Sequence, residues 1–567
     1  MTKPKTTPID YDVIIVGAGI SGISFAYRLQ EQNPNLSYCI LEARHEIGGT
    51  WSLFQYPGIR SDSDLHTFGF PWRPWIDKDA IAHGSKISRY LKDSAAQEGI
   101  DHYIKYNHRV SHISWSTAAK EWTLQVSLKD PGATKELRAR FIMLGTGYYD
   151  YDQPMHAEIP GLERFEGPVI HPQFWPKDLD YAGKSVVIIG SGATAITLLP
   201  AMAEKASHVT MLQRSPTYVV SIPREDKFEM AIRFFFPTLL ASKLVRFKWM
   251  LTSFVMVTFC QWFPNLARWL FRRTIKKELP EGMSLDPDFN PSYAPWQQRL
   301  CVCPDGDFYA CLRNGTGSVK TGVINTITPN SIQLGSGDEL NPDIIVTATG
   351  LRLRLAGGMD IEVDGQPFHI PDRFLWKGAM LEGLPNLTLA FGYVDASWTL
   401  GADATAQLVC RLLHRMRQEG VSMIVPRLSE SEKQGMGETP FLYLNSTYVQ
   451  KGQSVFPKLF TLYLILTINS DNVCRAPLVP TREMHGVLFV APDHIGFSKW
   501  SCILINYDVP EEIARQLEDL WDPDAKYEEI PEHPKAYEGE LTDDEEVEGR
   551  EQAQPAEEHA KKERPAQ

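Results

Sequence analysis

The sequence contains few cysteines for its length and has no Cys-x-x-Cys pair. Eight cysteines are spread over 567 residues. The closest pair, Cys301 and Cys303, has a spacing that suits neither a metal site nor a redox disulfide. We therefore predict buried, reduced thiols in a cytoplasmic protein without a metal centre. The missing pair also excludes a disulfide reductase of the Cys-x-x-Cys type.

Positive residues are fewer than negative ones, and no apolar segment precedes the first predicted strand. The net charge is −13 and the isoelectric point is about 5.7, which argues against nucleic acid as a partner. Because the N-terminal residues contain no apolar run, we expect no secretory signal. The hydrophobic content of 43% is ordinary for a globular protein, and the length suffices for two or three domains.

A dinucleotide-binding unit is predicted at the start of the chain. The β-branched run Tyr11–Val16 leads into a glycine loop, a helical pattern and a second strand that ends on Glu42. Gly17 and Gly19 permit a tight turn and a close approach of backbone N–H groups to a pyrophosphate, while Gly22 lets the helix pack on the strand. Glu42 can accept hydrogen bonds from ribose hydroxyls. The complete unit is a strong signal for a dinucleotide site.

A second unit of the same kind begins with the strand Ser185–Ile189 and ends, after a helix, with a strand that finishes on Arg214. A basic residue at that strand end suits a 2′-phosphate, where the first unit carries an acid. The alternative is that Arg214 is an ordinary surface residue. We expect two cofactors, FAD at the first unit and NADPH at the second. The loop of the second unit contributes the candidate cofactor-binding residues Gly190, Gly192, Ala193 and Thr194.

The loop Gly48–Asp62 follows the first unit and combines glycines, aromatic residues, a Pro-Gly turn and an acid. Glycine and proline at these positions predict neither helix nor strand. We expect the loop to lie beside the bound flavin and to present Asp62 to the chemistry. The prolines of Phe165–Pro176 likewise exclude regular structure, which places His171 and Trp175 on a linker between two lobes. Taken alone, His171 is more often a structural residue than a catalytic one.

Two strands are predicted to end in small residues where the chain crosses between the lobes. Phe141–Leu144 leads into Gly145-Thr146-Gly147, and Asp343–Gly350 repeats the pattern. Small residues let a backbone pass close to a ligand or to another chain segment.

These motifs carry a resemblance to a known family. GGTWSLFQYPGIRSD (48–62) and FEGPVIHPQFWP (165–176), flanked by the two glycine loops, resemble the fingerprints of class B flavoprotein monooxygenases. More narrowly, they are similar to the Baeyer–Villiger branch and, within it, to the ethionamide-activating type. The resemblance covers residues 10–415, and two long motifs in the correct order are specific.

The resemblance implies an NADPH-dependent flavin monooxygenase. Reduced FAD would react with O₂ to give a C4a-peroxyflavin, which would convert a lipophilic ketone into an ester or lactone. Arg299 matches the family's catalytic arginine, and Asp62 matches the carboxylate that orients it. Many relatives carry Lys where this chain has Gln298, which weakens the phosphate site and leaves more of it to Arg214. The implied cofactor-binding residues also include Gly49, Thr50, Trp51, Asp62, His171 and Trp175.

Two other functions stay open. One is a monooxygenase that oxygenates sulfur or nitrogen on the same scaffold. The other is a non-catalytic, nucleotide-binding relative, because the sequence after Glu419 departs from the family pattern.

The predicted fold class is α/β, with two Rossmann-like dinucleotide-binding domains for FAD and NADP and an inserted helical subdomain. The expected parts are the FAD domain (1–155 and 346–520), the NADP domain (156–225 and 291–345), the helical subdomain (226–290) and an acidic disordered tail (521–567). The tail is expected because its composition cannot bury a core.

The segment 229–279 is apolar, aromatic and basic. Three interpretations apply to it: a helical layer on the substrate side, a peripheral contact with a membrane, and a membrane span interrupted by polar residues.

Overall fold

The computed structural model describes residues 8–393, 396–428, 433, 438–439, 441–442, 446–460, 465–469 and 473–475. The chain divides into two units, Met1–Val509 and Pro510–Gln567, and all of the described residues belong to the first. The predicted acidic tail (521–567) and most of the divergent C-terminal region therefore lie outside the described residues.

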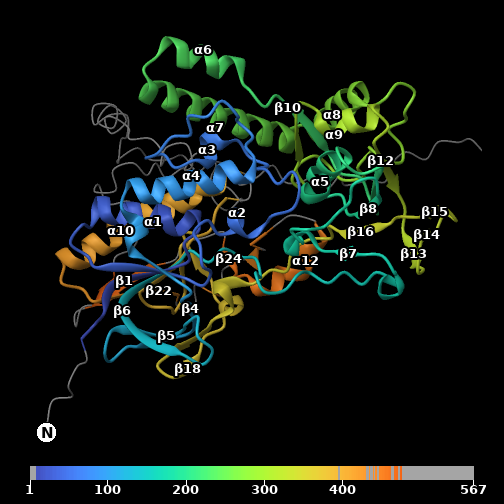
Figure 1. Ribbon diagram of the computed structural model, residues 1–567. Coiled ribbons are helices and arrows are strands. Elements are labelled where there is room, and N and C mark those ends of the chain that lie inside the picture. Colours follow the sequence, from blue (N-terminus) through green and yellow to red (C-terminus); the bar gives the residue numbers. More distant parts are fainter. Residues whose placement is uncertain are drawn as a thin grey trace, which may run out of the picture. The chain divides into compact units, whose positions relative to one another are not determined.

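The first lobe is built on a nine-stranded sheet, one end of which is parallel (Figure 1). The strand predictions for Tyr11–Val16 and Tyr38–Glu42 are confirmed at those residues. Both strands are apolar because helices cover one face and a second core covers the other. In spatial order, the parallel strands are β3 (Ile104–Tyr106), β2 (Tyr38–Glu42), β1 (Tyr11–Val16), β6 (Thr134–Leu144) and β21 (Leu387–Leu389).

The long strand β6 joins this parallel part to an antiparallel part. Its first half pairs with β5 (Glu121–Ser127), and β5 pairs with β4 (Arg109–Ser116). Beyond β4, β17 (Asp360–Val363) and β18 (Gln366–Pro367) complete the sheet. The carboxyl end of β6 therefore returns the chain to the edge where β1 also ends.

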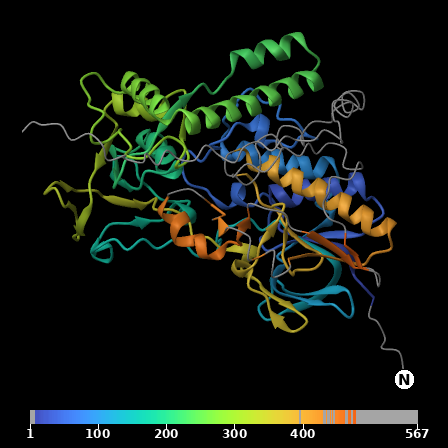
Figure 2. The ribbon, with the colours of Figure 1, turned by 180° about the vertical axis from the view of Figure 1, so that it is seen from behind.

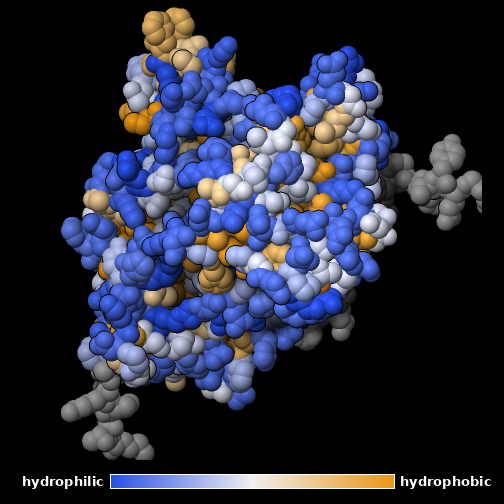
Figure 3. Space-filling view, turned by 45° about the vertical axis from the view of Figure 1, so that its right-hand side comes forward, coloured by the Kyte–Doolittle hydropathy of each residue, from blue (hydrophilic) through white to orange (hydrophobic). Residues whose placement is uncertain are grey.

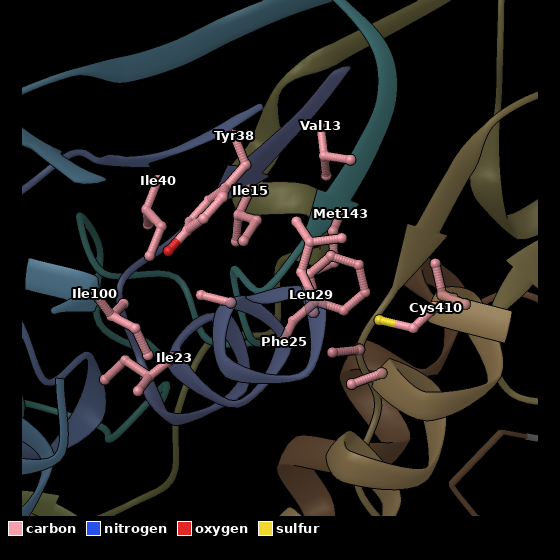
Figure 4. Close-up of a cluster of buried hydrophobic side chains, with 14 of the residues drawn as sticks. Val13, Ile15, Ile23, Phe25, Leu29, Tyr38, Ile40, Ile100, Met143 and Cys410 are labelled. Carbon is pink, nitrogen blue, oxygen red and sulfur yellow. The ribbon is translucent and has the colours of Figure 1, made fainter. Parts of the chain in front are cut away.

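Three helices cover one face of the parallel part: α1 (Ile20–Gln32), α4 (Gly84–Gln97) and α10 (Trp398–Gln418). Figure 4 shows Phe25 and Leu29 of α1 below strand residues such as Val13 and Ile15, with Cys410 of α10 beside them. Alternate residues of β1, Ile14 and Val16, face the opposite core, as the two-residue period of a strand requires.

The second lobe is built on a five-stranded, fully parallel sheet. The predicted strand Ser185–Ile189 is confirmed, and its neighbours are covered by α5 (Ala193–Ala203) and α9 (Asp307–Arg313). In spatial order, the strands are β12 (Gly317–Thr321), β9 (His208–Gln213), β8 (Ser185–Ile189), β16 (Ile344–Thr347) and β7 (Val169–Ile170).

The segment 229–279 forms helices, as one of its three interpretations predicts. They are α6 (Lys227–Phe235), α7 (Thr238–Trp262) and α8 (Pro264–Glu278). Pro264 occupies the first position of α8, where its missing N–H costs no hydrogen bond, so the apolar run is divided into two helices. Figure 2 shows α6 and α7 side by side, as does Figure 1. Of the helices in the described part of the chain, none is long and apolar enough to cross a membrane.

Short elements complete the described structure. Near the loop Gly48–Asp62 they are α2 (Thr50–Leu53) and α3 (Leu65–Phe68). The others are β10 (Val219–Ile222), β11 (Cys301–Pro304), β13 (Ile324–Ile327), β14 (Ile332–Leu334), β15 (Glu339–Leu340), β19 (Leu375–Trp376), β20 (Met380–Leu381), β22 (Met423–Arg427), β23 (Glu438–Thr439), α12 (Thr447–Gly452), β24 (Leu459–Phe460), β25 (Ile465–Asn469), β26 (Val473–Arg475), and the 3₁₀ turns η1 (Ile100–Tyr103), η2 (Leu162–Arg164), η3 (Pro172–Phe174), η4 (Leu355–Gly358), η5 (Ile370–Asp372) and η6 (Gln453–Val455).

Two predictions of irregular backbone were wrong in part. The loop Gly48–Asp62 contains the one-turn helix α2, because its breakers lie before Thr50 and after Leu53. The linker Phe165–Pro176 contains β7 and η3, whose Pro172 stands at a helix start where proline is tolerated. The strand β9, which was predicted to finish on Arg214, ends one residue earlier, at Gln213.

Candidate functional site

The two glycine loops are built in the same way. Gly17 follows β1 with φ of +103°, and a Cβ there would lie 2.7 Å from the carbonyl oxygen of Gly145 at the end of β6. Gly190 follows β8 with φ of +140°, and its Cβ would lie 2.2 Å from the carbonyl oxygen of Ala348 after β16. Each loop therefore packs against one of the two predicted crossing points, where ligands bind in open α/β sheets.

The helix that follows each loop has an N-terminus that no side chain caps. Gly19 caps α1 and Gly192 caps α5, in both cases without a side-chain cap and without an acid in the first turn. A Cβ on Gly19 would meet only the Cα of Gly49, at 3.7 Å, and a Cβ on Gly192 would meet no atom within 4 Å. Uncapped N–H groups, the positive end of the helix dipole and open space suit the phosphates of a dinucleotide.

Glu42 fixes the first glycine loop. Its two carboxylate oxygens accept hydrogen bonds from the backbone N–H of Ala18, at 2.7 Å, and of Arg44, at 2.8 Å. Burial raises the pKa of Glu42, and the hydrogen bonds from Arg44 and Ala18 oppose that shift. Each oxygen keeps a second lone pair, so the residue can hold the loop and also accept a ribose hydroxyl.

The corresponding position of the second lobe is Gln213, since it follows Leu212, the partner of Ile189, as Glu42 follows Leu41. Gln213 is buried and donates to the carbonyl of Asp288 and to Thr321. Arg214 is the next residue and is exposed. Its guanidinium donates to the hydroxyl of Thr447 at 3.0 Å.

The start of the loop Gly48–Asp62 lies against the first glycine loop. A Cβ on Gly49 would lie 3.2 Å from the Cα of Gly19. The hydroxyls of Thr50 and Tyr151 are 3.3 Å apart, and the ring of Trp51 stands edge-on to Phe68. Gly49, Thr50 and Trp51 are therefore next to the residues that suit a pyrophosphate.

The end of the same loop lies against the second lobe. A Cβ on Gly58 would lie only 2.6 Å from the Cβ of Ala201 on α5. Burial raises the pKa of Tyr56 to about 12, and a hydrogen bond with Thr194 of the second glycine loop opposes this. Arg60 forms an ion pair with Asp307 of α9, with Nη2 and Oδ1 3.3 Å apart. The loop thus joins both dinucleotide loops.

Asp62 and Arg299 meet at this junction. Asp62 Oδ2 lies 3.7 Å from Arg299 Nη1, and the side chains are 45% and 41% exposed. An ion pair with that exposure contributes about 0.2–1 kcal/mol to stability. Burial lowers the pKa of Arg299, but Asp62 and three tyrosines raise it by more, which keeps the guanidinium charged.

The linker residues lie on the second lobe. His171 caps η3 by accepting from the N–H of Gln173, and burial lowers its pKa while the backbone of Gly350 opposes that shift. The ring of Trp175 packs on the hydrophobic core around α5. His171 therefore lies at the crossing point after β16, and the contact of either residue with a cofactor stays a prediction.

Three tyrosines from distant parts of the sequence lie near Arg299 and were not predicted as site residues. The three tyrosines are Tyr148, Tyr149 and Tyr448. The hydroxyls of Tyr148 and Tyr149 are 3.1 Å apart, directly after the predicted crossing point Gly145-Thr146-Gly147. Tyr448 belongs to α12, in the region taken as divergent, and neighbours Thr447, the partner of Arg214. The position of Tyr148 after the glycines was a usable signal, whereas nothing in the local pattern marks Tyr448.

Comparisons with known proteins agree with this arrangement. A family model described as pyridine nucleotide-disulphide oxidoreductase matches residues 14–226. The FAD-containing monooxygenase EthA of Mycobacterium tuberculosis (strain ATCC 25618 / H37Rv) is 46% identical over 448 residues, which cover 79% of this chain and 91% of that protein.

Two solved structures share the fold. The oxidized steroid monooxygenase bound to NADP is 22% identical, with a TM-score of 0.63, and the match covers 79% of this chain and 94% of that one. The ε-caprolactone-bound cyclohexanone monooxygenase in its Loose conformation is 18% identical, with a TM-score of 0.62, and the match covers 75% and 91%.

Proposed function

This chain belongs to the FAD-containing monooxygenases, and from that premise we propose that it uses NADPH and O₂ to oxygenate lipophilic ketones. A ketone, O₂, NADPH and a proton would give an ester or lactone, NADP⁺ and water. FAD would occupy the first glycine loop and NADPH the second. One of the solved structures with the same fold, the cyclohexanone monooxygenase, contains bound ε-caprolactone. This lactone is the product expected from a cyclic ketone, which supports ketones as the substrate class.

The observation that carries the proposal is the charged guanidinium of Arg299 at the junction of the two dinucleotide loops. Bound FAD, once reduced, supplies the activation of O₂. Arg299 would stabilise the negative charge that develops on the substrate oxygen, which is the role of a preorganised cation in such transition states. Asp62 would keep the guanidinium aimed at that oxygen.

The segment around α12 supports a catalytic protein over a non-catalytic relative. Tyr448 lies among the residues that raise the pKa of Arg299, and Thr447 contacts Arg214. Phe456, further along, packs against Tyr148 with ring centroids 6.1 Å apart. The divergent sequence after Glu419 therefore still contributes side chains to the site.

Replacing Gly192 with alanine tests the second glycine loop. No atom lies within 4 Å of the new Cβ, and the residue has φ of −81°, so the fold should tolerate it. The methyl group would, however, separate a phosphate from the α5 N-terminus, so we expect the KM for NADPH to rise roughly tenfold. Steady-state kinetics on the flavin-loaded protein measure this. Gly335→Ala is the control, because its Cβ would likewise meet no steric clash: the nearest atom is the carbonyl oxygen of Val323, at 3.7 Å. An unchanged KM in Gly192→Ala would contradict the assignment.

Replacing Arg214 with alanine tests the 2′-phosphate. We expect the KM for NADPH to rise roughly tenfold, since a charge-assisted hydrogen bond is lost, while the KM for NADH stays constant. Flavin reduction by each coenzyme is the measurement, and NADH serves as the internal control. An equal rise for both coenzymes would mean that Arg214 acts only through its contact with Thr447.

Product analysis under ¹⁸O₂ tests the function itself. The flavin-loaded protein, NADPH and a long-chain methyl ketone should give an ester that carries one ¹⁸O atom. A parallel reaction offers an alkyl aryl sulfide of similar size. Sulfoxide without ester would favour the heteroatom monooxygenase, and consumption of NADPH without either product would contradict an oxygenase.

A further inference from the structure

Large apolar side chains are exposed mainly on the three helices α6, α7 and α8. In the described part of the chain, sixteen such side chains lie between residues 228 and 270 and only six lie elsewhere. Figure 3 shows apolar surface at the top of the view, over the end where α6 meets α7. Soluble monomers rarely expose an apolar area of this extent without a function for it. The sixteen are Phe228, Met230, Phe234, Phe235, Phe236, Leu239, Leu240, Phe247, Leu251, Val255, Met256, Trp262, Phe263, Leu266, Trp269 and Leu270.

Helix α7 is apolar on two opposite sides. One side, which includes Val245 and Trp249, is buried against the first lobe near Ala80. The other side carries five exposed apolar residues whose spacings of seven, four, four and seven place them in one stripe along the helix. The stripe consists of Leu240, Phe247, Leu251, Val255 and Trp262.

The helices are fastened to the first lobe on their buried side. His66 Nε2 lies 2.7 Å from Glu229 Oε2 of α6, and both side chains are almost fully buried. Arg246 of α7 donates to the carbonyls of His66 and Gly69 at 2.8 Å each. The exposed stripe therefore belongs to an anchored layer, and its exposure is a property of the folded protein.

The same segment is strongly basic in an acidic protein. Residues 227–279 contain ten Lys and Arg residues and two Glu residues, a net charge of +8, whereas the whole chain has −13. Arg273, Lys276 and Lys277 are exposed on α8, directly after the exposed pair Trp269 and Leu270. Exposed apolar and aromatic residues together with exposed cations in one helical segment match the composition of helices that lie in the headgroup region of a bilayer.

We propose that the outer face of α6, α7 and α8 docks on the surface of a membrane that contains anionic lipids. The exposed cations would contact the headgroups, and the Phe, Leu and Trp side chains would enter the boundary between headgroups and acyl chains. A second copy is a poorer occupant, because a two-fold interface would place the exposed cations of α8, among them Arg273, Lys276 and Lys277, of both copies on one shared face. The acidic residues 522–567 of this chain include few apolar residues that could cover the stripe.

Co-sedimentation of the full-length, flavin-loaded protein with vesicles tests the proposal. We expect binding to phosphatidylcholine vesicles that contain phosphatidylglycerol, much weaker binding to phosphatidylcholine alone, and a decrease with added salt. The variant Phe234→Gln/Phe235→Gln should reduce the bound fraction roughly tenfold, because these side chains, 82% and 74% exposed, would no longer enter the bilayer. Lys276→Gln/Lys277→Gln should weaken binding only to the anionic vesicles.

Two matched controls separate this surface from general effects. Ile76→Gln/Val323→Gln removes apolar side chains that are 69% and 63% exposed outside the three helices, and it should leave binding unchanged. Lys129→Gln/Lys135→Gln removes two exposed positive charges of the first lobe, and it should also leave binding to the vesicles unchanged. Equal binding of the wild type and the Phe variant would overturn the proposal, as would a wild type that stays in the supernatant with both vesicle types. A dimer in sedimentation velocity that the Phe variant abolishes, without vesicle binding, would assign the face to a second copy.

Discussion

Replacing Arg299 with alanine should lower the rate of ester formation by roughly a hundredfold to a thousandfold, the range found when one charge-stabilising group is removed from an active site. The bound flavin and its reduction by NADPH should stay near wild type. The reason is geometric: the guanidinium lies at the junction of the loops, 3.7 Å from Asp62, and contributes little to the fold. Rapid mixing with NADPH measures reduction, and product analysis measures ester.

Arg313→Ala is the matched control for this variant. Arg313 belongs to the same lobe, is 42% exposed compared with 41% for Arg299, and pairs with Glu278 at 3.3 Å. Its replacement should leave both half-reactions intact. Arg299→Lys keeps the charge but loses the planar fork, so it should recover only part of the activity. Ester yield near wild type in Arg299→Ala would remove Arg299 from the proposed role.

In the proposed mechanism, Asp62 acts on the guanidinium of Arg299 and not on the substrate. The pair is half-exposed and longer than a hydrogen bond. A second ion pair, between Arg60 and Asp307, is less exposed than the pair of Asp62 and Arg299 and joins the same loop to α9. The loop therefore forms two ion pairs with the second lobe, a less exposed one through Arg60 and a more exposed one through Asp62.

The sequence predicted those parts of the site that depend on local chemistry. Gly17 and Gly190 were recognisable because a strand, a glycine turn and a helix follow one another directly, and the structure places both against the predicted crossing points. The membership in a monooxygenase family, inferred from two motifs, is confirmed by a relative with 46% identity. The α/β fold class is confirmed as well: the second lobe has a fully parallel sheet, and the first has a mixed sheet with a parallel part.

The parts that depend on distant segments were not predictable. Tyr448 of α12 is close enough to influence Arg299 electrostatically although almost 150 residues of chain separate them, and no local pattern encodes such a proximity. Glu42 was expected to accept hydrogen bonds from ribose hydroxyls, and its oxygens also accept from the backbone N–H groups of Ala18 and Arg44, which the local pattern did not indicate. Apolar composition alone likewise could not tell which side of α7 would be buried, because both sides carry large apolar residues.

Alanine variants of two glycines in the first loop should distinguish a residue needed for helix packing from a residue needed for FAD binding. A Cβ on Gly22 would lie 2.0 Å from the carbonyl oxygen of Gly17 and 3.4 Å from Ile15. Because the nearest atom is backbone, relief requires a shift of α1 against β1, and overpacking of this kind costs about 1–3 kcal/mol or more. We expect Gly22→Ala to be purified without flavin and to unfold at a clearly lower temperature even as apoprotein.

Gly19→Ala should give the opposite pattern, although it lies three residues away in the same loop. Its backbone φ of −81° is ordinary, and its Cβ would be 3.7 Å from the nearest atom, so the stability of the apoprotein should change by less than about 0.5 kcal/mol. The methyl group would instead occupy the space that lets the backbone approach a pyrophosphate, so the Kd for FAD should rise. Thermal unfolding of the apoproteins and fluorescence titration with FAD measure the two effects. If Gly19→Ala binds FAD as the wild type does, the pyrophosphate does not lie at this N-terminus. If Gly22→Ala keeps its apoprotein stability, the packing of α1 on β1 does not depend on the missing side chain.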